Sequence, residues 1–122
     1  LFTPEKITSL NYDEVFVFGS NSEGMHWGGA ARTAHQHFGA IMGVSVGIQG
    51  QSYAIPTMEG GLESIRHFVN EFIQFARHNK HLFFFVTRIG CGIAGYTDNE
   101  IAPLFVAARN EENICLPKTF VS

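Results

Sequence analysis

The sequence predicts an α/β fold, a three-layer α/β/α sandwich built around a mixed, mostly parallel sheet. Two continuous apolar runs, residues 15–18 and 82–86, are typical of strands covered on both faces. Segments with apolar residues at helical spacing alternate with the strands. A glycine-rich turn follows each of the two runs. This alternation of strand and helix indicates a parallel sheet with helices on its faces.

The first strand, residues 15–18, ends in the turn-forming run 19–24. Residues 28–38 then form a helix with alanines and a phenylalanine on one face, and Gly39 suits its C-terminal cap. Ahead of these elements, residues 7–10 are predicted to form a short edge strand.

Residues 40–52 are predicted to be either a short strand or an ordered loop, because glycines interrupt a β-branched run. Residues 53–55 read as a strand, and apolar spacing predicts a helix over about 61–79. Residues 82–87 form the clearest central strand, and residues 114–116 form a short final one.

Thr97 and Glu100 make a capping-box signature for a last helix that runs to about residue 110. Pro103 lies further into this helix than the first-turn position that proline normally takes when the helix is capped at Thr97. The helix is therefore expected either to begin near residue 102 or to have a kinked first turn.

The 122 residues, 45% of them apolar, are predicted to form one domain, 1–122, with a substantial core. The net charge is −3 and no basic stripe is present, which argues against DNA or RNA as the main partner. A small-molecule nucleotide remains compatible, because backbone N–H groups can hold its phosphates without net positive charge. Composition leaves the oligomeric state open.

Cys91 and Cys115 have neither metal-ligand spacing nor the framework of a secreted protein. They are predicted to be reduced thiols of a cytoplasmic protein, with Cys115 in the core. The longest strongly apolar stretch, residues 82–86, is too short for a bilayer, and no signal-peptide layout is seen, so no membrane partner is expected. The six histidines lack partners at ligand spacing, so the sequence predicts no metal site and no cofactor.

Two glycine-rich loops carry the functional prediction. Each loop follows an apolar strand and leads into a helix. Parallel sheets bind ligands at such connections, at the carboxyl ends of their strands. Glycine lets consecutive N–H groups converge on an anion, and the helix dipole adds its positive end. Alternatively, these glycines only make tight connections. Neither loop matches a P-loop or a dinucleotide fingerprint. The glycines are Gly24, Gly28 and Gly29 in the first loop and Gly90, Gly92 and Gly95 in the second.

Several motifs resemble the macro domain. Residues 15–21, VFVFGSN, are similar to the strand ending in Asn that precedes the family's first glycine-rich loop, and Gly28-Gly29-Ala30-Ala31 to the loop and helix start. Residues 90–96, GCGIAGY, resemble the later Gly-x-Gly-Ile-x-Gly-Tyr/Phe loop. Lys6-Ile7-Thr8 falls where the family often carries Gly-Asp-Ile-Thr. The similarity covers nearly the whole chain in order, and indicates a compact, divergent member of bacterial or phage type.

The resemblance implies binding of ADP-ribose, and some members hydrolyse ADP-ribose adducts. It implies that Gly28, Gly29 and Ala30 lie along the distal ribose and diphosphate, and that residues 90–96 wrap the diphosphate, with Tyr96 as a lid over the sugar. The predicted ligand-binding set is Gly19, Ser20, Asn21, Gly24, Gly28, Gly29, Ala30, Arg88, Gly90, Cys91, Gly92, Ile93, Ala94, Gly95 and Tyr96.

Two departures from the family pattern bear on activity. The Asp that commonly holds the adenine amino group corresponds to Lys6. Some hydrolases carry an Asp shortly after the first glycine run, where this chain has Ala30, Ala31 and Arg32. No carboxylate therefore takes the role of activating water there, and hydrolysis is left open.

Asn21 and His26 are the candidate catalytic residues. Asn21 matches the Asn that contacts the distal ribose in hydrolytic members, although an Asn at a strand end is also a common turn former. His26 could hydrogen-bond a phosphate or act as an acid or base, with an exposed loop histidine as the alternative. Cys91 is disfavoured as a nucleophile, because no His or Asn is placed by sequence to serve it.

The remaining polar candidates each have two interpretations. Arg88 pairs either with the diphosphate or with Asp98. Trp27 either stacks on a ring of the ligand or covers the loop. Gln49 and Gln51 either line the adenine side of a pocket or are ordinary turn residues.

The leading prediction is binding of ADP-ribose or a related nucleotide diphosphate through the two loops, with hydrolysis of an ADP-ribose adduct left open. Two alternatives remain. One is a module that kept the fold as a structural or protein-interaction unit without the ligand. The other is a hydrolase of another nucleotide or of a phospho-sugar.

Overall fold

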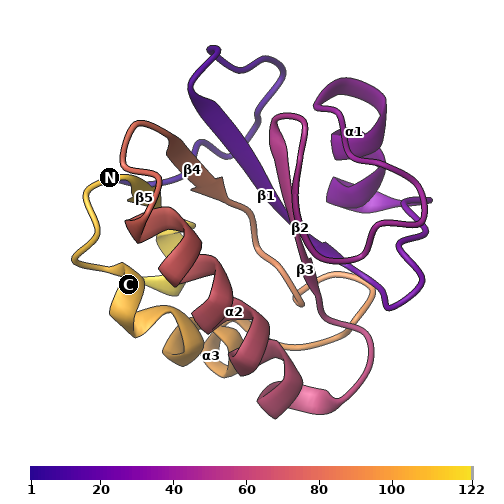
Figure 1. The fold of residues 1–122 in the computed structure, drawn as a ribbon. Coiled ribbons are helices and arrows are strands. Elements are labelled where there is room, and N and C mark those ends of the chain that lie inside the picture. The colour runs from indigo at the N-terminus through magenta and orange to yellow at the C-terminus, as the bar shows by residue number, and fades with distance from the viewer. Residues whose placement is uncertain (122) are drawn as a thin grey trace.

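A five-stranded mixed sheet forms the middle of the molecule in the computed structural model, which describes residues 1–121 (Figure 1). The strand order is β2-β3-β1-β4-β5. β1 runs parallel to both β3 and β4, β5 runs parallel to β4, and β2 pairs antiparallel with β3 at one edge. The strands are β1 Glu14–Ser20, β2 Gly47–Gln49, β3 Ser52–Pro56, β4 Phe83–Val86 and β5 Ile114–Cys115.

Helices cover both faces of this sheet, so the molecule has three layers (Figure 1). Helix α1, Gly29–His37, packs on one face. Helix α2, Gly61–Arg77, and the short α3, Asp98–Ile101, pack on the other, together with the 3-10 helix Ala102–Ala108. A second 3-10 turn, Lys118–Phe120, closes the described chain. The predicted α/β sandwich with a mixed, mostly parallel sheet is confirmed.

The central strand β1 is buried on both faces. Val15 and Val17 belong to the core beneath α2, whereas Phe16 and Phe18 belong to the core beneath α1. The alternation follows from the two-residue period of a strand. It explains why residues 15–18 read as a continuous apolar run rather than as an alternating one.

Helix α2 closely matches its predicted range of 61–79. Its buried residues are spaced three or four apart, so that one face of the helix lies on the sheet. Phe72 meets Phe84 of β4 edge to face, with 5.4 Å between ring centroids. Within residues 1–121, no helix combines the length and the apolar character that crossing a bilayer requires. The buried face of α2 and the strand β4 both contribute to the larger core cluster.

The connections after β1 and β4 leave the sheet on opposite sides. The loop after β1 leads to α1, which packs with one core cluster, and the loop after β4 leads to α3, which packs with the other. β1 and β4 are adjacent parallel strands. In such sheets a crevice opens at the carboxyl ends of the two strands, where the direction of winding reverses.

Two predicted elements differ from the structure. Residues 7–10 do not form an edge strand. Ile7 and Leu10 instead pack against the core beneath α1, while the edge near α1 is taken by β2. The last helix is α-helical only over Asp98–Ile101 and continues as a 3-10 helix to Ala108, with Pro103 at the change. Proline cannot donate an N–H to the helical ladder, which accounts for the break.

Gly24 shapes the first glycine-rich loop by close backbone contact. Its φ is +68°, and a Cβ at this position would lie 2.5 Å from the backbone nitrogen of Val44. We expect Gly24→Ala to destabilise the fold by about 3 kcal/mol, from strain in the left-handed region plus the clash. Urea unfolding followed by circular dichroism measures this.

Gly43→Ala is the matched control, because Gly43 has φ +87° with open space around its Cβ position. This variant should lower the free energy of unfolding by only about 1 kcal/mol, because it has the strain of the left-handed backbone conformation without a clash. Equal losses in the two variants would contradict the close approach at Gly24.

Candidate functional site

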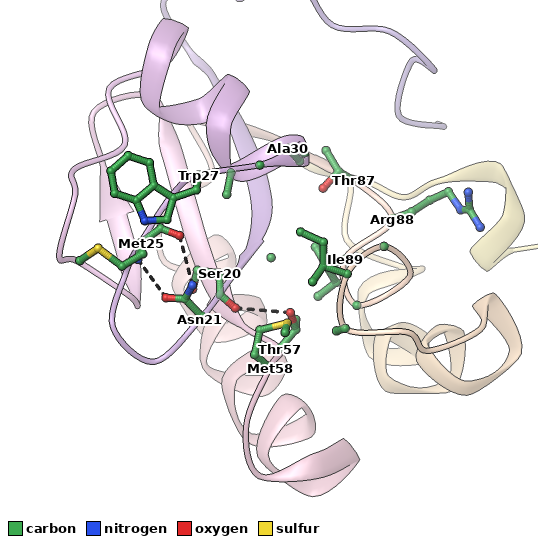
Figure 2. Close-up of a pocket in the computed structure, with 18 residues that line it drawn as sticks. Ser20, Asn21, Met25, Trp27, Ala30, Thr57, Met58, Thr87, Arg88 and Ile89 are labelled. Atoms are coloured by element: carbon green, nitrogen blue, oxygen red, sulfur yellow. Dashed lines mark hydrogen bonds between the residues drawn. The ribbon is translucent and has the colours of Figure 1, made fainter.

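A cavity of about 350 Å³ opens at the carboxyl ends of β1 and β4 (Figure 2). It lies at the crevice expected from the reversal of the chain's winding. The residues that line it are Gly19, Ser20, Asn21, Met25, Trp27, Gly28, Gly29, Ala30, Ala31, Thr57, Met58, Thr87, Arg88, Ile89, Gly90, Gly92, Ile93 and Ala94. Both glycine-rich loops therefore contribute residues to the lining of the same cavity.

The two loops approach each other directly. A Cβ on Gly28 would lie 3.7 Å from the Ile93 side chain, and a Cβ on Gly19 would lie 3.6 Å from the Gly90 nitrogen. The sequence prediction required residues 24–29 and 90–95 to share one end of the sheet. The structure brings the Gly28 end of the first loop against the second loop.

Asn21 orders the first loop. Its Oδ1 accepts a hydrogen bond from the Met25 N–H at 2.9 Å, and its Nδ2 donates to the Met25 carbonyl at 3.1 Å (Figure 2). Asn21 still lines the cavity. The residue therefore performs the turn-forming role, and its amide group is already engaged by the loop.

The first turn of α1 offers uncapped N–H groups to the cavity. Its N-cap residue is Gly28, which provides no side-chain hydrogen bond. The N–H groups of Gly29, Ala30 and Ala31 donate to no atom of residues 1–121. All four residues line the cavity. Such unpaired donors at a helix start, with the positive end of the helix dipole, favour an anion.

The second loop is a compact turn that closes on itself. The Tyr96 N–H donates to the Gly90 carbonyl at 2.8 Å, and the Gly95 N–H donates to the Gly92 carbonyl at 3.0 Å. In this part of the described chain the N–H groups of Gly92, Ile93 and Ala94 have no acceptor. These three residues also line the cavity. Residues with unpaired N–H groups from both loops thus line one space.

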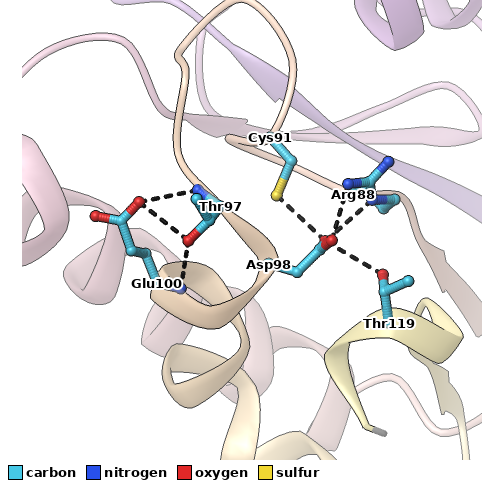
Figure 3. Close-up of polar contacts among 6 residues, drawn as sticks. All are labelled: Arg88, Cys91, Thr97, Asp98, Glu100 and Thr119. Atoms are coloured by element: carbon cyan, nitrogen blue, oxygen red, sulfur yellow. Dashed lines mark hydrogen bonds and ion pairs between the residues drawn. The ribbon is translucent and has the colours of Figure 1, made fainter.

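A charged cluster that includes Arg88 of the cavity lining anchors the second loop (Figure 3). The Arg88 guanidinium donates two hydrogen bonds to Asp98, at 3.0 and 2.8 Å. Asp98 also accepts from the Thr119 hydroxyl at 3.2 Å. The hydrogen bonds from Arg88 are the main reason that the pKa of the Asp98 carboxyl is lowered. Of its two predicted partners, Arg88 takes Asp98.

Cys91 joins the same cluster and is not activated. Its Sγ lies 3.5 Å from Oδ1 of Asp98, as a thiol donor would. Burial, followed by the nearby Asp98 charge, raises the pKa of the Cys91 thiol to about 11. A thiolate is therefore rare at neutral pH, which agrees with Cys91 being disfavoured as a nucleophile.

The structure places His26 neither in the cavity lining nor on the exposed surface of the loop. The side chain is 1% exposed, so it is not a solvent-exposed loop histidine. It does not line the cavity, and its Nε2 lies 2.9 Å from the Ile41 carbonyl. Its ring meets Phe18 edge to face at 5.2 Å. His26 thus ties the first loop to the segment that precedes β2 and does not reach a reacting group.

Other predicted ligand residues also lie outside the cavity. Gly24 packs against the backbone at Val44. Cys91, Gly95 and Tyr96 do not line the cavity. Tyr96 packs against the larger core cluster, which excludes the lid position in this structure.

The two glutamines have structural roles as well. Gln49 is buried, and its amide bonds to the backbone of Ile41 and Val44. Gln51 donates to the carbonyls of Asn11 and Glu14. Neither lines the cavity, so both order the turn around β2 rather than a pocket.

Several cavity residues were not singled out from the sequence. Thr57 and Met58 follow β3, and Thr87 follows β4, so all three come from strand ends. Position immediately after a predicted parallel strand is the signal that could have found them. Among residues 1–121, no group of three His, Cys, Asp or Glu side chains is arranged to hold a metal ion.

A second cavity, of about 650 Å³, adjoins the first. The two share Ala30, Thr87 and Arg88 in their linings. The second cavity is lined by the N-terminal residues 3–7 and by Lys118 and Thr119. We refer to the two adjoining cavities together as the cleft, and Ala30 in the first turn of α1 lines both.

Comparisons with protein-family models, with curated proteins and with solved structures found no match.

The raised pKa of Cys91 gives a direct test of its surroundings. At pH 8 about one thiol in a thousand is ionised if the pKa is about 11. We expect alkylation by iodoacetamide to be slow at pH 8 and to rise through pH 10–11. In Asp98→Asn the midpoint should fall, because the negative charge that opposes the thiolate is gone while Arg88 stays. Mass spectrometry of the labelled protein at each pH measures the midpoint.

Glu100→Ala is the control for loosening of the loop, since it removes the side chain that accepts from the Thr97 N–H in the capping box and keeps Asp98. Its midpoint should move much less. A midpoint near 8.5 in the wild-type protein would contradict this description of Cys91.

Proposed function

We propose that this chain binds ADP-ribose or a related nucleotide diphosphate, with the diphosphate held between the two glycine-rich loops. The observation that carries this proposal is that residues from both loops whose N–H groups have no acceptor within residues 1–121 line one cavity. A diphosphate supplies several acceptor oxygens and negative charge, which those donors and the α1 dipole would stabilise. The macro-domain resemblance of the same loops supports this choice of ligand.

The electrostatics of the cavity also support an anion held by neutral donors. Arg88 is the one charged residue in the first cavity's described lining, and its guanidinium is paired with Asp98. Backbone amides bind an anion without the desolvation cost of a second buried charge. A chain with a net charge of −3 can therefore hold a phosphate group at this point.

The dimensions of the cleft fit a nucleotide diphosphate. The first cavity is about 350 Å³ and the adjoining one about 650 Å³. Each volume lies within the range that is usual for small-molecule sites. The diphosphate would lie where the two meet, and the groups on either side of it would occupy the two cavities.

Binding is the activity we propose, ahead of hydrolysis. No carboxylate or imidazole belongs to the first cavity's lining within residues 1–121. Asn21 is engaged by Met25 and His26 is buried elsewhere. Within residues 1–121 the carboxylate that lines the cleft, Glu5, belongs to the second cavity, so a general base at the first cavity would have to come from the bound ligand itself. Both cysteines are free, which fits the cytoplasmic location that we also propose.

Calorimetric titration with ADP-ribose, ADP, AMP and NAD tests the proposal. We expect heat of binding from the diphosphates and a weaker response or none from AMP. Absence of heat from every compound at millimolar concentration would contradict the proposal and favour a structural or protein-interaction module. A response to AMP alone would favour a different nucleotide or a phospho-sugar.

Gly92→Val tests where the ligand lies. A Cβ at Gly92 meets no atom within 4 Å, so the fold tolerates it, yet the new side chain enters the space beside the free donors. We expect the Kd for ADP-ribose to rise at least about tenfold, since a lost hydrogen bond to a charged group is worth that much. The melting temperature should move by less than about 2 °C.

Ser22→Val is the matched control, because Ser22 is exposed in the first loop and does not line the cavity. Its affinity for ADP-ribose should equal that of the wild-type protein. Equal affinity in Gly92→Val and wild type would place the ligand elsewhere.

A further inference from the structure

Three large apolar side chains stand exposed around the mouth of the first cavity. Trp27 is 72% exposed, Met58 45% and Ile93 81%. All three line the cavity. They come from the first loop, from the connection after β3 and from the second loop, so three separate segments place them there. We call these three residues the apolar rim.

The core does not account for the apolar rim. None of the three side chains belongs to either core cluster of the described chain. Single exposed apolar residues are common on protein surfaces, but a group of them around one opening marks a binding site. Figure 2 shows Trp27 on the first-loop side of the cavity and Met58 on the Thr57 side. The rim therefore flanks the space where the diphosphate is proposed to lie.

The opposite end of the cleft has no exposed aromatic side chain in the described chain. The second cavity is lined by the charged Lys6, Lys118 and Glu5, by four threonines and by apolar residues such as Pro4, Ile7 and Pro117, and the aromatic residue in its lining, Phe16, is buried in the core. A flat ring would find no exposed aromatic face there, whereas the indole of Trp27 is available. Of the two ends of the cleft, the end at the apolar rim is therefore the one that favours a planar ring.

We propose that the apolar rim takes a planar ring that the ligand carries on one side of its diphosphate, stacked on Trp27 and flanked by Met58 and Ile93. This inference rests on the proposed function and narrows it to diphosphates with a nucleobase or a similar heteroaromatic ring on the rim side. Stacking of a base on an aromatic side chain typically changes affinity by about tenfold when the side chain is removed. Because Trp27 is exposed, its side chain can change rotamer to meet the ring.

The test uses a ligand with a ring at both ends and one with none. NAD carries a ring on each side of its diphosphate, so one ring faces the rim in either orientation, and inorganic pyrophosphate carries no ring. Trp27 is the sole tryptophan of the sequence, so intrinsic fluorescence reports on it alone. We expect NAD to change both the intensity and the emission maximum of Trp27, and pyrophosphate to bind with little change.

Substitutions give the energetic readout by calorimetry. Trp27→Ala should weaken NAD about tenfold and leave pyrophosphate unchanged, while Trp27→Phe should retain most of the affinity. Met58→Ser should weaken NAD by a smaller factor, which gives a second test independent of Trp27. Tyr12→Ala is the matched control, because Tyr12 is an aromatic residue that is 93% exposed and lies outside both cavities.

The outcomes separate the two proposals. If NAD binds equally to wild type and Trp27→Ala and leaves the fluorescence unchanged, the ring does not lie on the rim, and a protein partner becomes the better occupant of this surface. That result overturns the inference while the diphosphate site stands. If neither NAD nor pyrophosphate gives heat with the wild-type protein, the proposed function itself fails.

Discussion

The parallel pairing of β1 with β4 is the constraint on which the candidate site depends. It places the ends of two strands side by side, with Phe16 opposite Phe85 and Val17 opposite Val86. The chain then has to leave the two ends toward opposite faces, because α1 and α3 pack on different sides of the sheet. The crevice between the departing loops follows from this geometry and needs no special side chain.

Within that crevice, the backbone does most of the recognition that we propose, and the side chains hold the backbone in place. Asn21 fixes the first loop through Met25, and Asp98 fixes the region of the second loop through Arg88 and Thr119. The arginine that sequence reasoning could assign to a phosphate is thereby tied to a carboxylate. An ion pair at the surface contributes little to stability, so its value here lies in orientation.

Sequence periodicity predicted the sheet and the long helix well, because burial on two faces and burial on one face leave different spacings in the sequence. It failed where a residue's neighbours come from distant segments. His26 looks like a loop histidine, yet Phe18 and the Ile41 carbonyl enclose it. Residues 7–10 look like a strand, yet their apolar side chains serve the core beneath α1. The capping box of Thr97 and Glu100 was predicted correctly, since it depends on residues three apart.

The sequence by itself determined the α/β class, the strands near residues 15–18, 53–55, 82–87 and 114–116 and the positions of both glycine-rich loops, because each depends on local spacing and on the freedom of glycine. Tertiary structure alone decided which loop residues face the cavity. Gly28 and Gly92 line the cavity, whereas Gly24 and Tyr96 pack against other parts of the protein. Thr57 and Met58, which follow a third strand, also line it. The physical reason is that facing a shared space depends on strand pairing and on the side of the sheet where each helix packs, and neither can be read from one segment of the chain.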